Sequence, residues 1–139
     1  FRSLISVLAG MCPMPDIVAP GLSDLMVNAV EHGNLGVTYQ EKSLLKWEGD
    51  WEAEIKRRLA LPQFAGRFAT VRAERSPTCI IFTITDQGAG FEWHKFLTFD
   101  PDRAFDPNGR GIAMAKMMSF ATLEYQGRGN VVVAQVSLT

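Results

Sequence analysis

The chain has 139 residues, of which 47% are hydrophobic and 21% are charged, as in one globular domain with a core of ordinary size. Its formal net charge of −1 gives no bulk attraction to nucleic acid or to an anionic membrane, so we expect neither as a partner. The sequence has no secretory signal pattern and no apolar run of the roughly 20 residues that span a bilayer. Because it begins at Phe1, we expect residues 1–139 to be a single domain of a longer protein.

The two cysteines, Cys12 and Cys79, are far apart and lie in different kinds of segment. They form no disulfide framework and have no metal-ligand spacing. Cys79 lies in an apolar run, where a buried free thiol is the common case. The cysteines therefore predict a reduced protein in the cytoplasm.

The first third of the chain predicts two helices. Residues 2–11 form a short helix that prolines terminate. A longer helix runs from Asp16, as its cap, to about His32 and ends at Gly33, with a kink or a late start at Pro20-Gly21.

Residues 38–60 predict a further helical stretch, broken near Gly49-Asp50 and terminated by Pro62. Apolar side chains recur along it at three- and four-residue spacing, which predicts one apolar face. These are Leu44, Trp47, Trp51, Ile55 and Leu59. The two tryptophans either pack on the sheet edge or lid, or form a surface for a partner or a second copy.

The second half predicts strands. Residues 68–74 alternate, residues 79–85 are a β-branched and aromatic run, and residues 122–125 and 131–138 read as a hairpin. A polar, aromatic loop occupies residues 91–108, and a short helix follows over residues 111–119. Helices first and strands later predict an α+β fold, with an antiparallel or mixed sheet covered by helices on one face.

The long helix carries an acid and an amide on its polar face. Asp24 and Asn28 are four residues apart, so their side chains are neighbours. A carboxylate beside an amide oxygen can hold Mg²⁺ together with substrate phosphates, and a carboxylate can also orient or deprotonate a nucleophile. The alternative is the solvated face of an amphipathic helix.

Two glycine-rich segments follow. The predicted strand 79–85 ends in Asp86-Gln87-Gly88-Ala89-Gly90, where an acid can accept a hydrogen bond from an exocyclic amine and glycines let a flat ligand approach the backbone. The alternative is a strand-ending turn.

The second segment is Asn108-Gly109-Arg110-Gly111, before a helix. Free N–H groups and the helix dipole can bind phosphate there, with assistance from the arginine. The alternative is a flexible loop end with an N-cap.

The order of these three segments resembles the GHKL ATPase superfamily. S-D-L-M-V-N-A-V-E-H-G is similar to its N box, D-Q-G-A-G-F to its first Gly box and G-R-G-I-A-M-A to its second, from about Leu22 to the C-terminus. N-A-V-E-H-G-N is most similar to anti-sigma-factor serine/threonine kinases and to the ATPase modules attached to bacterial response regulators and phosphatases. The resemblance implies a two-layer α/β sandwich of the GHKL (Bergerat) type, with a mixed, mostly antiparallel sheet, helices on one face and a lid loop.

The resemblance further implies ATP and Mg²⁺ as ligands. Asn28 is expected to bind Mg²⁺ through its side-chain oxygen, and Asp86 to accept a hydrogen bond from the adenine amino group. Gly88 and Gly90 are expected to lie against the base and ribose, and residues 91–108 to form the lid. The residues expected to wrap the phosphates are Gly109, Arg110 and Gly111.

Three positions need separate interpretation. His32 either completes the N box or makes a cap interaction at the helix C-terminus, and we interpret His94 as a surface histidine. Asp24 occupies the place where the related kinases have Glu as a base for the protein serine or the attacking water. Aspartate is one methylene shorter, and a displacement near 1 Å can lower a rate about a hundredfold, although an intervening water can bridge the gap.

Three functions are therefore considered. The first is a protein serine/threonine kinase of bacterial partner switching, with Asp24 as catalytic residue, which phosphorylates a small STAS-type antagonist and sequesters a sigma factor. The second is a binding module without kinase activity. The third is the ATPase half of a sensor histidine kinase, which the settings of His32 and His94 do not favour.

Overall fold

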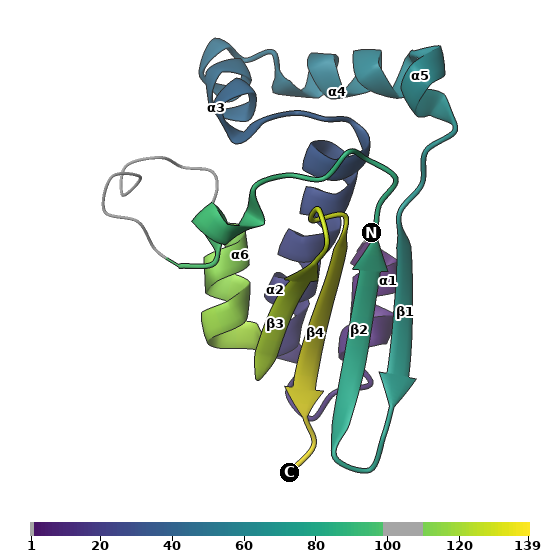
Figure 1. The fold of residues 1–139 in the computed structure, drawn as a ribbon, viewed down its shortest axis with the longest axis vertical. Helices are drawn as coiled ribbons and strands as arrows, with labels where there is room; N and C mark the ends of the chain where they lie inside the picture. Colours follow the sequence, from purple (N-terminus) through teal and green to yellow (C-terminus); the bar gives the residue numbers. More distant parts are fainter. Residues whose placement is uncertain (1, 99–109) are drawn as a thin grey trace.

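The structure is a computed structural model that describes residues 2–98 and 110–139. Within these residues four strands form one antiparallel sheet in the order β1-β2-β4-β3 (Figure 1). The strands are β1 (Thr70–Arg75), β2 (Cys79–Thr85), β3 (Thr122–Gln126) and β4 (Val131–Ser137). Short hairpins join β1 to β2 and β3 to β4, and such connections produce antiparallel neighbours. Of the two predicted alternatives, the antiparallel sheet is confirmed and the mixed sheet is wrong for the described strands.

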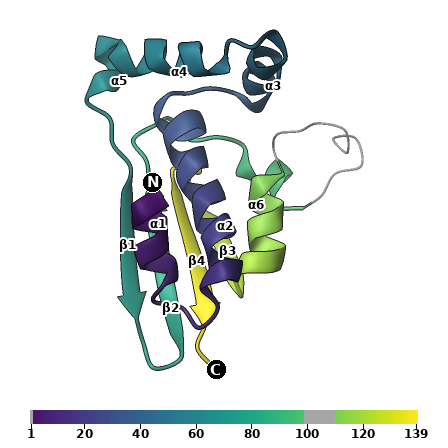
Figure 2. The same ribbon diagram turned by 180° about the vertical axis from the view of Figure 1, so that it is seen from behind.

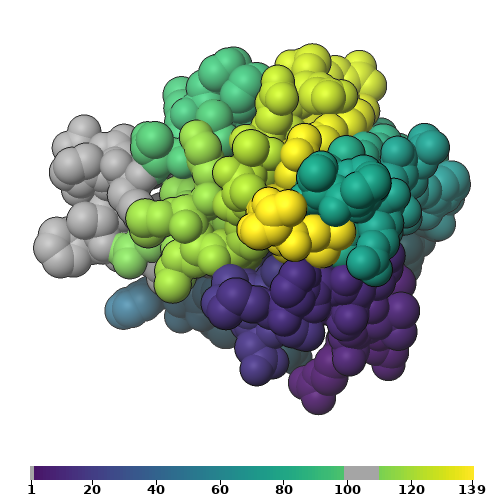
Figure 3. Space-filling view, turned by 90° about the horizontal axis from the view of Figure 1, so that it is seen from below, coloured from purple at the N-terminus to yellow at the C-terminus, as the bar shows by residue number. Residues whose placement is uncertain are grey.

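Helices cover one face of this sheet (Figure 2). They are α1 (Arg2–Ala9) and α2 (Pro15–Val27), which continues as the wider π-helical η1 (Asn28–Asn34). α6 (Gly111–Met114) likewise continues as the π-helical η4 (Ala115–Ser119) and packs against α2. Seen from below, the N-terminal helices form one layer and the strands β2 and β4 the other (Figure 3). The fold is therefore α+β with two layers, as the order of the elements predicted.

The core lies between these two layers. Strand β2 shows the predicted alternation, with Ile80, Phe82 and Ile84 buried against the helices. Opposite them α2 buries Val18, Leu22, Leu25 and Met26, and η1 buries Ala29. Burial of this apolar surface is the main favourable contribution to folding.

Several helix boundaries differ from the sequence prediction. α2 begins at Pro15 with no side-chain cap, so Asp16 is not its cap, because proline itself suits the first helical position. The helix is continuous through Pro20-Gly21, which therefore mark no late start. It also extends in π-helical form one residue beyond Gly33. Cys79 is partly exposed, and both cysteines are free.

Residues 39–65, which we call the arm, lie beyond one end of the sheet (Figure 1). They contain α3 (Tyr39–Glu48), α4 (Trp51–Ala60) and the short α5 (Pro62–Ala65). A capping box of Thr38 and Glu41 starts α3, and Gly49, with φ +80°, produces the predicted break. Pro62 begins α5 as well as following the end of α4.

Arg58 holds the arm together and attaches it to the rest of the domain. Its guanidinium donates to Glu41, to Glu54 and to the backbone carbonyl of Leu35. Trp47 is 88% exposed, so packing of this side chain on the sheet edge or lid was wrong. Trp51 is half-buried and lies 5.0 Å from the Lys42 ammonium, within the arm. The predicted partner surface remains a prediction.

No helix within residues 2–98 and 110–139 is long and apolar enough to cross a membrane.

Candidate functional site

The structure brings the predicted site residues to one end of the sheet, where β2 ends, η1 ends and α6 begins. Asp86, Gly88 and Gly90 follow β2, and Asn28 begins η1. Arg110 directly precedes α6, which Gly111 begins. Gly109 lies outside the described residues, as does most of the predicted lid.

Asp86 is a buried carboxylate, 7% exposed, at the end of β2. Its Oδ1 accepts a hydrogen bond of 2.8 Å from the Gly88 N–H, and its own N–H donates to the Asn130 carbonyl. Burial raises the pKa of Asp86, while the Gly88 hydrogen bond opposes that rise. Such a fixed acceptor at low exposure can bind a donor strongly, because a charged group forms the stronger hydrogen bonds.

The glycines around Asp86 lie so close to neighbouring atoms that there is no space for a side chain on them. A Cβ on Gly33 would overlap the Asp86 carboxylate, and a Cβ on Gly88 would overlap the Gly33 carbonyl. Gly90 has φ +90°, and a Cβ there would overlap the Arg128 carbonyl, which accepts a hydrogen bond from Phe91. The close packing of the protein itself thus requires glycine at all three positions.

Asn34 fixes the same turn, and the sequence analysis assigned it no role. This side chain is 3% exposed, and its Oδ1 accepts a hydrogen bond of 2.7 Å from the Gln87 N–H. Its backbone carbonyl accepts from Arg67 at 2.7 Å. The end of η1 and the turn after β2 are therefore held in one arrangement. The only signal in the sequence was the position of Asn34 directly after the N-box histidine and glycine.

Asp24 is half-buried and lies against the start of α6. A Cβ on Gly111 would come within 3.1 Å of the Asp24 Cγ, so the carboxylate packs on the Gly111 backbone. Burial raises the pKa of Asp24, and the positive charge of Lys42 partly opposes it. A carboxylate of raised pKa is a better proton acceptor once ionised. The structure thus brings Asp24 to the second glycine-rich segment.

Asn28 lies one helical turn after Asp24, whose carbonyl accepts its N–H. Its Oδ1 accepts a hydrogen bond of 3.0 Å from the Tyr39 hydroxyl. Burial raises the pKa of Tyr125, and a hydrogen bond with the Asn28 side chain opposes that rise. Asn28 is therefore a partly buried residue between two phenols, and not part of a solvated helix face. Nothing in the sequence indicated that Tyr39 contacts Asn28, because Tyr39 belongs to a separate helix and the spacing of residues along one helix does not reveal contacts with another.

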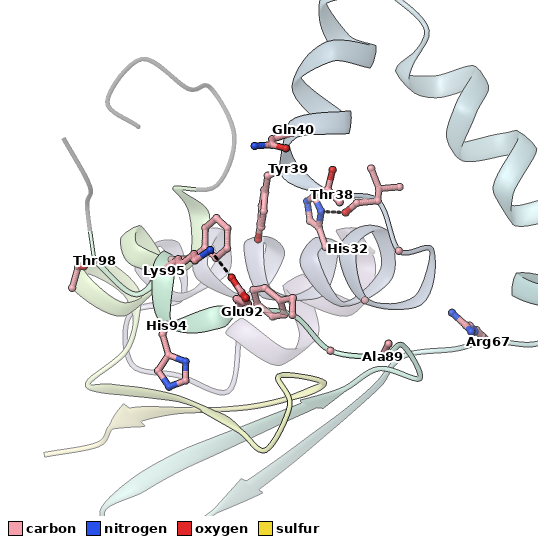
Figure 4. Close-up of a pocket in the computed structure, with 16 residues that line it drawn as sticks. His32, Thr38, Tyr39, Gln40, Arg67, Ala89, Glu92, His94, Lys95 and Thr98 are labelled. Atoms are coloured by element: carbon pink, nitrogen blue, oxygen red, sulfur yellow. Dashed lines mark hydrogen bonds and ion pairs between the residues drawn. The ribbon is translucent and has the colours of Figure 1, made fainter. Parts of the chain in front are cut away.

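A cleft of about 1120 Å³ lies between the end of η1 and the start of α3 on one side and the segment after Gly88 on the other (Figure 4). Tyr39, Phe91 and Phe96 are among the side chains of its lining, and Arg67 lies at one end of it. Its volume and mixed lining suit an organic ligand. η2 (Trp93–Phe96) forms part of its outer wall, and His94 is exposed, as predicted.

Asn28 and Asp86 line a separate inner cavity of about 10 Å³ and are not among the described residues that line the cleft. Gly33 and Phe91 belong to both linings, so the two spaces adjoin. The inner cavity is smaller than a nucleotide base, so a ligand of that size would reach Asp86 only after side chains between the two spaces had moved.

His32 is buried and makes an interaction of the cap type. Its Nδ1 hydrogen-bonds to the carbonyl of Val37, beyond the end of η1, and its ring stacks on Tyr39 with 3.9 Å between centroids. Since a carbonyl only accepts, Nδ1 carries the proton. Burial lowers the pKa of His32 to about 4, against the opposing effect of the Val37 carbonyl. The histidine is therefore neutral at pH 7.

This pKa predicts acid sensitivity. Between pH 6.5 and about 4, His32 is protonated in the unfolded chain and remains neutral in the folded chain. The free energy of unfolding therefore falls as the pH is lowered through this range. The expected loss is about 3 kcal/mol. Chemical denaturation at pH 7 and pH 4 should show a loss that is larger by this amount in the wild type than in His32→Phe. Equal losses would contradict the assignment, since the raised pKa values of Asp24 and Asp86 act equally in both proteins.

No model of a known protein family matches the chain, and no curated protein is significantly similar to it. The fold and site therefore define the class only as an α+β domain with a two-layer arrangement and a polar cleft at one end of its sheet.

Asn28 and Asp24, one helical turn apart, carry the side-chain oxygens that the sequence analysis associated with a cation. Within residues 2–98 and 110–139 no three side chains of His, Cys, Asp or Glu gather as a metal cage. Mg²⁺ usually keeps several waters and is held by one or two side chains together with substrate phosphates. This donor set fits Mg²⁺ that arrives with a nucleotide, and fits an all-protein metal site poorly.

Proposed function

We propose that this site binds ATP with Mg²⁺ and that the domain is of the GHKL (Bergerat) type. The observation that carries the proposal is the meeting of three segments far apart in the chain. Asp86 packs on Gly33 at the end of η1, and Asp24 packs on Gly111 at the start of α6. A nucleotide needs sites for its base, its metal and its phosphates side by side. The two contacts bring together the three segments that were expected to supply these sites.

Each residue has a role in this proposal. Asp86 accepts the hydrogen bond from the adenine amine, and the backbone of Gly88 and Gly90 lies against base and ribose. Asn28 holds Mg²⁺, which neutralises charge on the phosphates. The phosphates lie at the start of α6, against Gly109, Arg110 and Gly111.

The reaction we propose is phosphoryl transfer to a protein serine. The serine oxygen forms a bond to the γ-phosphorus, the bond from that phosphorus to the bridging β-oxygen breaks, and ADP leaves with the electron pair. Asp24 accepts the hydroxyl proton and orients the nucleophile. The substrate is a small STAS-type antagonist, a sigma factor is the sequestered partner, and the setting is the bacterial cytoplasm. The exposed Trp47 on the arm is the proposed contact for such a partner or for a second copy.

A second candidate is a module that binds ATP and a partner without catalysis. The packing of Asp24 on the Gly111 backbone favours it, because the carboxylate of this shorter acid then serves to position α6. Transfer activity separates the two candidates.

Removal of the metal ligand tests the binding proposal. ATP is titrated into the wild type and into Asn28→Ala, each with Mg²⁺ and with EDTA. We expect Mg²⁺ to tighten binding about tenfold in the wild type and to have no effect in the variant, because one coordinating oxygen is lost. Gln63→Ala, on the exposed surface of α5, serves as the control. An unchanged Mg²⁺ effect in Asn28→Ala would remove the metal assignment.

A further inference from the structure

Tyr39 occupies a position that none of the three sequence motifs includes. Its hydroxyl donates a hydrogen bond of 3.0 Å to Asn28 Oδ1. The same oxygen is the Mg²⁺ ligand in the proposed function, on which the following inference rests. A phenol O–H and a cation are both attracted by the partial negative charge of this oxygen.

The ring of Tyr39 is held on both sides. It stacks on His32 at 3.9 Å and packs in a tilted contact against Phe96 of η2 at 4.5 Å, both measured between ring centroids. In Figure 4 the side chain extends from the start of α3 between His32 and the segment that carries Lys95. Three segments of the chain, η1, α3 and η2, therefore meet at this one ring.

Tyr39 lines the cleft, whereas Asn28 lines the inner cavity of about 10 Å³. A cavity of this size holds about one water, and a Mg²⁺ ion that keeps several waters and binds phosphates needs far more space. Tyr39 bonds to Asn28 from the cleft, which is the side from which a metal-loaded nucleotide would approach this residue. The amide oxygen has a second lone pair, but a hydrated ion that approaches from the cleft meets Tyr39 before Asn28, so the phenol must move for that ion to bind.

We propose that Tyr39 controls access of the metal-loaded nucleotide to Asn28. In one arrangement the phenol bonds to Asn28 Oδ1, and in the other Mg²⁺ binds this oxygen and the phenol has left. Because Tyr39 is the first residue of α3, its departure changes the start of the arm. Occupancy of the nucleotide site is thereby transmitted to the arm, where Trp47 is exposed.

The test compares ATP affinity with Mg²⁺ and with EDTA for the wild type, Tyr39→Phe and Trp47→Phe. Phenylalanine keeps the ring stack and removes only the hydroxyl that competes for Asn28. We expect Tyr39→Phe to bind Mg-ATP about fivefold more tightly than the wild type, in line with the loss of one competing neutral hydrogen bond, and to bind metal-free ATP equally well. The exposed aromatic on the same helix, in Trp47→Phe, should change neither affinity.

The outcomes separate this inference from the proposed function. If the wild type binds ATP with a Mg²⁺ effect and Tyr39→Phe shows the same ratio, or weaker Mg-ATP binding, the role of Tyr39 is wrong and the nucleotide site stands. If the wild type binds no ATP, both are wrong. Hydrogen exchange of amides 39–43 in the wild type gives a second reading that needs no variant. It should increase with Mg-ATP and not with ATP in EDTA, and an unchanged pattern would contradict the proposal.

Discussion

Asp24→Asn is expected to lower the rate of phosphoryl transfer between about a hundredfold and ten-thousandfold, while ATP affinity stays within about twofold. The amide has nearly the shape of the carboxylate and can still pack on the Gly111 backbone, but it cannot accept the proton of the nucleophile. A base lost without a change of shape lowers the rate of the chemical step and leaves ground-state binding intact.

The rate is measured as ADP formation with water as the acceptor, since the attacking oxygen must lose a proton in that reaction also. Asp50→Asn, at an exposed position between α3 and α4, is the matched control. Equal and measurable rates for Asp24→Asn and the wild type would exclude Asp24 as the base, and the absence of any rate in both proteins would favour the binding module.

Asp24→Glu gives the complementary reading. If the domain is a kinase weakened by its shorter acid, the added methylene should raise the rate. The carboxyl carbon of Asp24 already lies close to Gly111, since a Cβ built on that glycine would be 3.1 Å from it, so the longer side chain must displace the start of α6. A rise in rate would show that this shift is tolerated, and a binding module would show no rate in either variant.

Asp86→Asn is expected to weaken ATP binding about tenfold to a hundredfold, which corresponds to the loss of one hydrogen bond to a charged acceptor. The asparagine can still accept the Gly88 N–H through its oxygen, so the turn after β2 is kept. Its amide nitrogen replaces the second carboxylate oxygen and presents a donor, which repels the adenine amine.

The stability of Asp86→Asn shows whether weaker ATP binding results from the lost hydrogen bond or from unfolding of the variant. Burial raises the pKa of Asp86, so the ionised side chain makes the folded state less stable at neutral pH than a carboxylate of unshifted pKa would. The neutral asparagine is therefore expected to leave the free energy of unfolding unchanged or slightly higher. Calorimetric titration and thermal unfolding of Asp86→Asn, with Asp50→Asn as control, measure both quantities. Unchanged ATP affinity in a folded variant would contradict the role of Asp86.

The sequence predicted best those elements whose pattern reflects the core. The alternation of β2 was confirmed at Ile80, Phe82 and Ile84 because the strand is buried on the face that the helices cover. The break of the arm was confirmed at Gly49, which has the positive φ that favours glycine. Both features depend on residues within one short segment, which is why the sequence predicts them.

The remaining features depend on contacts between distant segments. No periodicity in the sequence indicates the π-helical extension at Asn28. The prediction of Asp16 as the cap of α2 was wrong because the helix already begins at Pro15. Tyr39 and Asn34 act through partners in other elements, and neither lies on an apolar repeat. The motif glycines were found in the sequence, but the packing that requires Gly33 and Gly88 is visible only in the fold.

The most direct test of the central claim is a titration of the wild-type domain with ATP and, separately, with GTP, both with Mg²⁺. Asp86 is an acceptor fixed by the Gly88 N–H. It can bond to the amine at position 6 of adenine and is repelled by the carbonyl oxygen that guanine has there. The account predicts one saturable site with ATP bound at least about tenfold more tightly than GTP. Equal affinity for the two nucleotides, or no binding of ATP at millimolar concentration, would contradict it.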